Sequence, residues 1–148
     1  MKQRVLFVCI HNSGRSQMGE GFLRHLAPGR FEVASAGIEA GKLNPLVVRS
    51  MAEVGVDLSS HFSKTVQSLI DAGQTFDVVI TVCDETNAER CPMVPGRVVN
   101  TQAKRLHWGF ADPSALAGTD DEKLAGIRPI RDAIRSRIET WLKETSHD

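Results

Sequence analysis

The chain has 148 residues, of which 41% are hydrophobic, and it carries 18 basic and 18 acidic residues. This length and composition suit a single globular domain, which we expect to span residues 1–148. The balanced charge gives no indication of a nucleic-acid partner, and no apolar run approaches the ~20 residues that cross a bilayer. The apolar stretch near Met1 is also too short for a signal peptide, so we expect a cytoplasmic protein. The balanced charge and ordinary composition make a monomer the default expectation.

The first half of the chain alternates between strand and helix patterns. A continuous apolar run over residues 5–9 is typical of a strand buried on both faces. Helical spacing of large apolar residues and the turn residues between segments predict the elements that follow. These are a helix over 16–27, a strand over 31–36, a helix from Asn44-Pro45 to Gly55 and a short helix from about 63 to 73.

The second half predicts two more strands and a long last helix. The strands cover 76–82 and, briefly, 97–100, and residues 107–113 lack periodicity, which indicates a loop. The last helix carries isoleucines at helical spacing, and Pro129 must lie in its first turn or kink it. Alternating strands and helices predict an α/β fold with three layers, a doubly wound four-stranded parallel sheet with its functional site at the carboxyl ends of the strands.

The segment between the first strand and the first helix has the composition of an oxyanion pocket. Cys9 ends the strand, and a helix N-terminus offers free N–H groups and a positive dipole that favour an anion or a thiolate. Arg15 adds a planar guanidinium that fits tetrahedral oxyanions. A free cysteine is more often a small buried apolar residue, but this context favours a nucleophile. The expected binding residues are His11, Asn12, Ser13, Gly14, Arg15 and Ser16.

Two further cysteines and one aspartate extend this candidate site. Cys83 follows the predicted strand 76–82, so it lies near Cys9 if the two strands are neighbours. Cys91 follows on a polar loop and is able to exchange disulfides with Cys83 if that loop moves. Asp112 precedes Pro113, which suits either a turn cap or a general acid. Incidental cysteines remain an alternative, and a zinc site is disfavoured because no Cys-x-x-Cys pair is present.

At this point the sequence resembles the thioredoxin-coupled arsenate reductases, which share the low-molecular-weight protein tyrosine phosphatase fold. The resemblance covers nearly the whole chain. It rests on Cys9 to Met18, Ser35-Ala36-Gly37-Ile38, Asn44-Pro45, Thr81-Val82-Cys83, Cys91-Pro92 and His107 to Pro113. The phosphatase branch carries tyrosine after Asp-Pro, whereas Ser114 follows Pro113 here and the chain has no tyrosine. That difference favours the reductase branch.

The resemblance implies a mechanism and a reductant. Cys9 would attack arsenate held by Arg15 and the loop, with phosphate or sulfate as analogues, and Asp112 would protonate the leaving oxygen. Cys83 would release arsenite by forming a disulfide with Cys9, and Cys91 would take that disulfide over for reduction by thioredoxin. No bound cofactor or metal is implied. Glutaredoxin with glutathione is an alternative reductant, because the loop between Cys83 and Cys91 is one residue longer than we expect for the family.

The resemblance leaves two alternatives open. A phosphatase would need only Cys9, Arg15 and Asp112, and a protein that binds oxyanions or senses redox state would need no turnover.

Some family members also bind potassium through residues that correspond to Asn12, Glu20, Ser35 and Lys64. Since Lys64 is itself a cation, we expect its ammonium to take the ion's place. His25 and His61 are expected to be surface or local hydrogen-bonding residues.

Overall fold

The computed structural model describes residues 2–39, 41–83 and 99–145. Within these residues the strands form one parallel sheet in the order β2-β1-β3-β4. The elements are β1 (Gln3–Cys9), α1 (Arg15–Leu26), β2 (Phe31–Gly37), α2 (Pro45–Ala52), α3 (Val66–Asp71), β3 (Phe76–Thr81), β4 (Val99–His107), a 3-10 turn η3 (Pro113–Ala115) and α4 (Asp120–Thr145).

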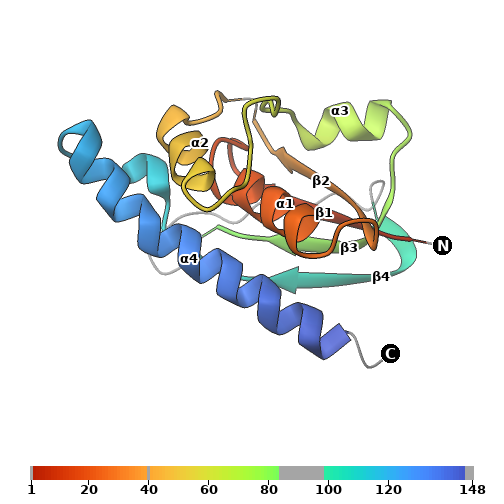
Figure 1. The fold of residues 1–148 in the computed structure, drawn as a ribbon. Coiled ribbons are helices and arrows are strands. Elements are labelled where there is room, and N and C mark those ends of the chain that lie inside the picture. The colour runs from red at the N-terminus through yellow and green to blue at the C-terminus, as the bar shows by residue number, and fades with distance from the viewer. Residues whose placement is uncertain (1, 40, 84–98, 146–148) are drawn as a thin grey trace.

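Helices cover both faces of this sheet (Figure 1). One face packs Val5 and Phe7 of β1 against apolar residues of α1, α2 and α4. The opposite face packs Leu6 and Val8 against α3. Because alternate residues of β1 point to opposite faces, its continuous apolar run is what two helical layers require. The predicted three-layer α/β architecture is confirmed.

The fourth strand differs from its prediction. It was expected to end at Asn100, whereas β4 runs to His107. Among the described strands β4 lies at the edge and pairs with β3, and most of its later residues whose side chains are described are exposed or half-buried. An edge strand can therefore carry polar residues such as Lys104 and Arg105. For this reason the apolar pattern did not predict the second part of β4. As a result His107 ends a strand and does not begin a loop.

Pro129 was expected in the first turn of the last helix or at a kink in that helix, and the first of these alternatives is wrong. It lies inside α4, well beyond the first turn, because the helix already begins at Asp120. Proline has no N–H to donate to the carbonyl four residues earlier, that of Ala125. The helix continues past this gap because its apolar side, which includes Ile127 and Ile134, is buried in the main core.

A charged cluster joins α2 to α4 on the same side of the sheet. The Glu53 carboxylate, just after α2, accepts hydrogen bonds from Arg128 Nε at 3.0 Å and Nη2 at 2.7 Å. It also accepts one from Arg131 Nη1 at 2.8 Å. The hydrogen bonds from Arg128, aided by Arg131 and by both positive charges, outweigh partial desolvation and lower the pKa of Glu53 from 4.5 to about 2.

This cluster predicts an acid-dependent contribution to stability. The pKa of Glu53 is lower in the folded state, so its stabilising effect is complete above pH 4.5 and is lost as the pH falls toward 2. Glu53→Gln should therefore lower the melting temperature at pH 6, and the difference from wild type should shrink below pH 4.5. Thermal unfolding followed by circular dichroism measures it. Glu139→Gln, at an exposed pair with Arg135, is the control, and a difference that does not vary with pH would contradict the prediction.

Candidate active site

The loop between β1 and α1 surrounds a buried thiol. Cys9 ends β1 with its side chain 3% exposed, and it is a free cysteine. Its Sγ lies 2.9 Å from Ser16 Oγ and accepts the backbone N–H of Asn12 at 3.1 Å. Asn12 has a left-handed backbone with φ of 53°, which an asparagine tolerates better than most residues. The loop thus aims hydrogen-bond donors at the sulfur, an arrangement that favours a thiolate.

Two glycines allow other segments to approach this loop closely. A Cβ on Gly14, the residue before α1, would lie 2.7 Å from Pro113 Cγ. A Cβ on Gly37, at the end of β2, would lie 2.6 Å from the carbonyl oxygen of Ile10. Side chains at these positions would push the 112–113 segment and β2 away from the loop.

Arg15 and Asp112 face each other at the edge of the loop. The Arg15 side chain is 5% exposed, and its Nη1 donates to the carbonyl oxygen of Phe110 at 3.0 Å. Its Nη2 lies 4.0 Å from Asp112 Oδ2. Asp112 Oδ1 accepts the N–H of Ser114 at 2.9 Å, so the aspartate caps η3. This is the turn-cap role, one of the two roles predicted for Asp112. The other carboxylate oxygen, Oδ2, faces Arg15 and is not the oxygen that caps η3. The role of Asp112 as a proton donor stays a prediction.

Cys83 follows β3, the strand that pairs with β1, so Cys83 and Cys9 lie at the same carboxyl edge of the sheet. The backbone ladder between β1 and β3 extends to a hydrogen bond of 3.0 Å from Val82 N–H to the carbonyl oxygen of Val8. Cys83 follows Val82, and Cys9 follows Val8. The two strands are neighbours in the sheet, as the expectation for Cys83 required. Cys83 is fully buried and disulfide-bonded. Its partner is not Cys9, whose thiol is free, and Cys91 lies outside the described residues.

The remaining loop residues expected to bind substrate have different environments. His11 directs its side chain to Glu39, with Nε2 and Oε2 3.2 Å apart, so only its backbone can contribute to the loop. The Ser13 carbonyl accepts the N–H of Asn44 at 2.9 Å. Asn12 is completely buried and donates its side-chain amide to Ser16 Oγ at 2.7 Å. Among these residues Ser16 contacts the thiol with its side chain, and Asn12 contacts it with its backbone N–H and supports the Ser16 hydroxyl with its side chain.

The structure adds Gln17 and His61, which the sequence analysis did not assign to the site, to the polar residues behind the loop. Gln17 is fully buried and bonds to Asn12 and to His61, which was expected to be a surface or local hydrogen-bonding residue. Burial lowers the pKa of His61 despite the nearby carboxylate of Glu20. Lys64 Nζ lies 3.9 Å from Glu20 Oε1, and burial lowers its pKa too. The contacts of His61 with Gln17 and of Lys64 with Glu20 join segments more than forty residues apart, beyond the reach of local periodicity.

Comparison with known proteins agrees with this geometry. Residues 4–148 match the family described as low molecular weight phosphotyrosine protein phosphatase. An arsenate reductase of Shouchella clausii is 42% identical over 95% of both chains. A solved arsenate reductase in a phosphate-binding state shares 33% identity, with a TM-score of 0.77 over 97% of this chain and 98% of the other. A thioredoxin-dependent arsenate reductase of Corynebacterium glutamicum shares 30% identity, with a TM-score of 0.66 over 97% of this chain and 60% of the other.

A buried cysteine at the end of a parallel strand, in a loop that leads into a helix headed by arginine, is the arrangement of a thiol-dependent oxyanion enzyme. The chain belongs to the low molecular weight phosphotyrosine protein phosphatase family and, within it, to the branch of the arsenate reductases. Among the described residues, no helix combines the length and the apolar character needed to span a membrane.

Proposed function

We propose that this protein reduces arsenate to arsenite with Cys9, Cys83 and Cys91 as successive thiols and thioredoxin as the electron donor. The observation that carries the proposal is the pair of cysteines at the sheet edge. Cys83 is disulfide-bonded and Cys9, at the same sheet edge, is free, which is the state expected of these two residues after a relay has moved its disulfide away from the nucleophile. The arsenate reductases among its relatives support arsenate as the oxyanion.

The first chemical step assigns roles to three residues. The Cys9 thiolate attacks arsenic and forms a sulfur–arsenic bond, while one arsenate oxygen leaves as water with a proton from Asp112. Arg15 lies in place to bind two oxygens, because Phe110 already holds its guanidinium at the loop edge. The amides of the first turn of α1 have no intrahelical acceptor and are available for the remaining oxygens.

Two thiol exchanges complete the relay. The Cys83 thiolate attacks the sulfur of Cys9, the sulfur–arsenic bond breaks with its electron pair on arsenic, and arsenite leaves. This oxidises the two cysteines to a disulfide and reduces arsenic by two electrons. Cys91 then attacks Cys83, which frees the Cys9 thiolate, and a dithiol such as thioredoxin reduces the second disulfide. No bound cofactor enters these steps.

The reductant and the compartment follow from the same chemistry. A related arsenate reductase is described as thioredoxin-dependent, which supports thioredoxin over glutaredoxin with glutathione. Free thiols such as Cys9 persist in reducing compartments, so we place the reaction in the cytoplasm. Each relay step uses cysteines of one chain, and we propose that a monomer is sufficient.

A coupled assay tests this proposal. Arsenate added to the wild-type protein with thioredoxin, thioredoxin reductase and NADPH should cause continuous NADPH oxidation, with one arsenite formed for each NADPH consumed. Omission of thioredoxin should stop the reaction, and replacement by glutaredoxin with glutathione should not restore the full rate. Arsenate binding without NADPH oxidation would instead indicate an oxyanion-binding or redox-sensing protein.

Phosphomonoester hydrolysis is the second candidate, favoured by the match to the phosphatase family and by the approach of Asp112 to Arg15. Phosphate and arsenate have nearly the same shape, so one pocket can stabilise both transition states. Hydrolysis of p-nitrophenyl phosphate without any NADPH oxidation in the presence of arsenate would favour the hydrolase.

We infer that the Lys64 ammonium takes the place of a potassium ion beside the loop in this chain. Asn12 Oδ1 already accepts hydrogen bonds from Lys64 N–H at 3.0 Å and from Gln17 Nε2 at 2.9 Å. Glu20 Oε1 accepts the Ser35 hydroxyl at 2.6 Å and lies 3.9 Å from Lys64 Nζ. The oxygens that would bind the cation are thus engaged, and an ammonium group supplies positive charge to the carboxylate.

Arsenate turnover should therefore be equal in sodium and potassium buffers of the same ionic strength. The reason is that Lys64 is covalently attached and supplies positive charge near Glu20 in both buffers, in addition to Arg24, whose Nη2 lies 2.8 Å from Glu20 Oε2. Lys64→Asp should remove this charge and make the rate depend on the cation. The initial rate of NADPH oxidation measures both effects, and marked activation of the wild-type protein by potassium would refute the prediction.

A further inference from the structure

The buried amide of Gln17 has a single permitted orientation. Its Nε2 contacts three oxygens, the carbonyl of Asn12 at 3.2 Å, the side chain of Asn12 at 2.9 Å and the carbonyl of Phe62 at 3.0 Å. Its Oε1 lies 2.9 Å from Nδ1 of His61. A flipped amide would place Oε1 against those three acceptors, so Nε2 must donate toward the loop and Oε1 must accept from His61.

This orientation fixes the direction of the hydrogen bonds nearer to the thiol. Because Asn12 Oδ1 accepts from Gln17 and from the Lys64 N–H, its Nδ2 donates to Ser16 Oγ at 2.7 Å. A hydroxyl has one hydrogen, and with Asn12 donating to its oxygen that hydrogen is directed to Cys9 Sγ, 2.9 Å away. Asn12 and Ser16 thus lie between Gln17 and the thiol, but the orientation of Gln17 determines the direction of the last hydrogen bond.

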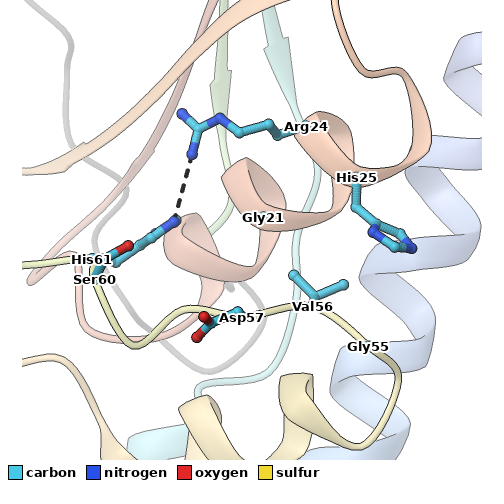
Figure 2. A pocket seen from close by; sticks show the side chains of 8 residues that line it. All are labelled: Gly21, Arg24, His25, Gly55, Val56, Asp57, Ser60 and His61. Carbon is cyan, nitrogen blue, oxygen red and sulfur yellow. Dashed lines mark hydrogen bonds between the residues drawn. The ribbon is translucent and has the colours of Figure 1, made fainter.

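The outer end of this series of hydrogen bonds is Arg24, a cation at the surface. His61 donates from Nδ1 to Gln17, so its Nε2 is the acceptor and faces Nη1 of Arg24 at 3.5 Å (Figure 2). Desolvation lowers the pKa of His61, which suits a neutral ring with one donor and one acceptor. The pocket around this contact is lined by Gly21, Arg24, His25, Gly55, Val56, Asp57, Ser60 and His61. Every group from Arg24 inward thus donates toward Cys9.

We propose that Gln17 is a positioning residue for the Cys9 thiolate, which it stabilises by aligning a one-directional hydrogen-bond chain from Arg24 through His61, Asn12 and Ser16. The inference rests on the proposed role of Cys9 as nucleophile. Aligned hydrogen bonds polarise one another, so loss of the central amide weakens the final donor without touching it. The charged or titratable groups that surround the chain are Arg15, Glu20, Arg24, Asp57, Lys64 and Asp112.

The test measures the reactivity of Cys9 alone. In a Cys83→Ser, Cys91→Ser background, Cys9 is the sole thiol, and its rate of alkylation by iodoacetamide is followed from pH 4 to 10. Gln17→Met keeps the length of the side chain and removes its hydrogen bonds. We expect the midpoint of the pH profile to rise by about 0.5 to 1 unit, which slows alkylation below the midpoint roughly three- to tenfold.

Gln67→Met is the matched control, because Gln67 is an exposed glutamine whose amide donates to the nearby Asp71 at 2.9 Å. It should leave the profile unchanged. Gln17→Glu is a second variant should Gln17→Met fail to fold, and it should raise the midpoint further, because a carboxylate cannot donate to Asn12 and adds negative charge. Unchanged profiles in folded Gln17 variants would overturn the inference.

The two proposals can fail separately. The alkylation profile does not require arsenate, so a wild-type protein that failed to oxidise NADPH would refute the reductase while the effect of Gln17 could still be measured. Conversely, active wild-type enzyme with an unaltered profile in Gln17→Met would refute only the role of Gln17.

Discussion

Replacement of Cys83 by serine is expected to abolish repeated reduction of arsenate. Without this thiol nothing in the relay attacks the sulfur of the Cys9–arsenic adduct, and the sulfur–arsenic bond keeps its electrons. Serine is a poor substitute because its hydroxyl does not form a disulfide. NADPH oxidation with thioredoxin and its reductase should fall to the rate seen without enzyme, and arsenite measured after quenching should stay below one equivalent per protein.

The other two cysteines provide the matched comparison. Cys91→Ser should release one arsenite per protein molecule and then stop, because the disulfide between Cys9 and Cys83 has no further acceptor. Cys9→Ser should release none. Hydrolysis of p-nitrophenyl phosphate should be lost only in Cys9→Ser, since that chemistry needs a single thiolate. Continued arsenate turnover by Cys83→Ser would show that the relay as written is wrong.

The second large effect is expected for Arg15→Lys, with a fall in kcat/KM for arsenate of about 100- to 1000-fold, the usual loss when one donor to a developing oxyanion is removed. The guanidinium of Arg15 uses one nitrogen to bond to Phe110 and keeps another near Asp112. A lysine ammonium is a point charge and cannot keep both contacts while it binds two oxyanion oxygens.

Steady-state rates at varied arsenate concentration measure this effect, and the affinity for inorganic phosphate gives an independent measurement of binding. Arg30→Lys is the control, because Arg30 is exposed and contacts the ring of Phe31, away from the loop. If Arg15→Lys changed kcat/KM no more than this control, the oxyanion-binding role of Arg15 would be wrong.

Local patterns were sufficient for the elements that position the nucleophile. The apolar run of β1, the glycine before α1 and the cap and proline that open α2 are properties of neighbouring residues, and Asn44 does accept the N–H of Leu46 at 3.0 Å. The same rules missed the length of β4 and left two positions open for Pro129. There the conformation depends on a neighbouring strand and on a buried helix face, which outweigh the preferences of the residues themselves.

The sequence by itself determined the α/β class, the strand-to-helix turn with Cys9 and Arg15, and the presence of Cys83 at a strand end. It did so because these depend on short spacings and on the rule that parallel strands share one carboxyl edge. Only the tertiary structure decided that Val82 bonds to Val8, that Arg15 rests on Phe110, and that Gln17 joins His61 to Asn12. Those contacts link distant segments, and burial makes each polar group find a partner wherever the fold supplies one.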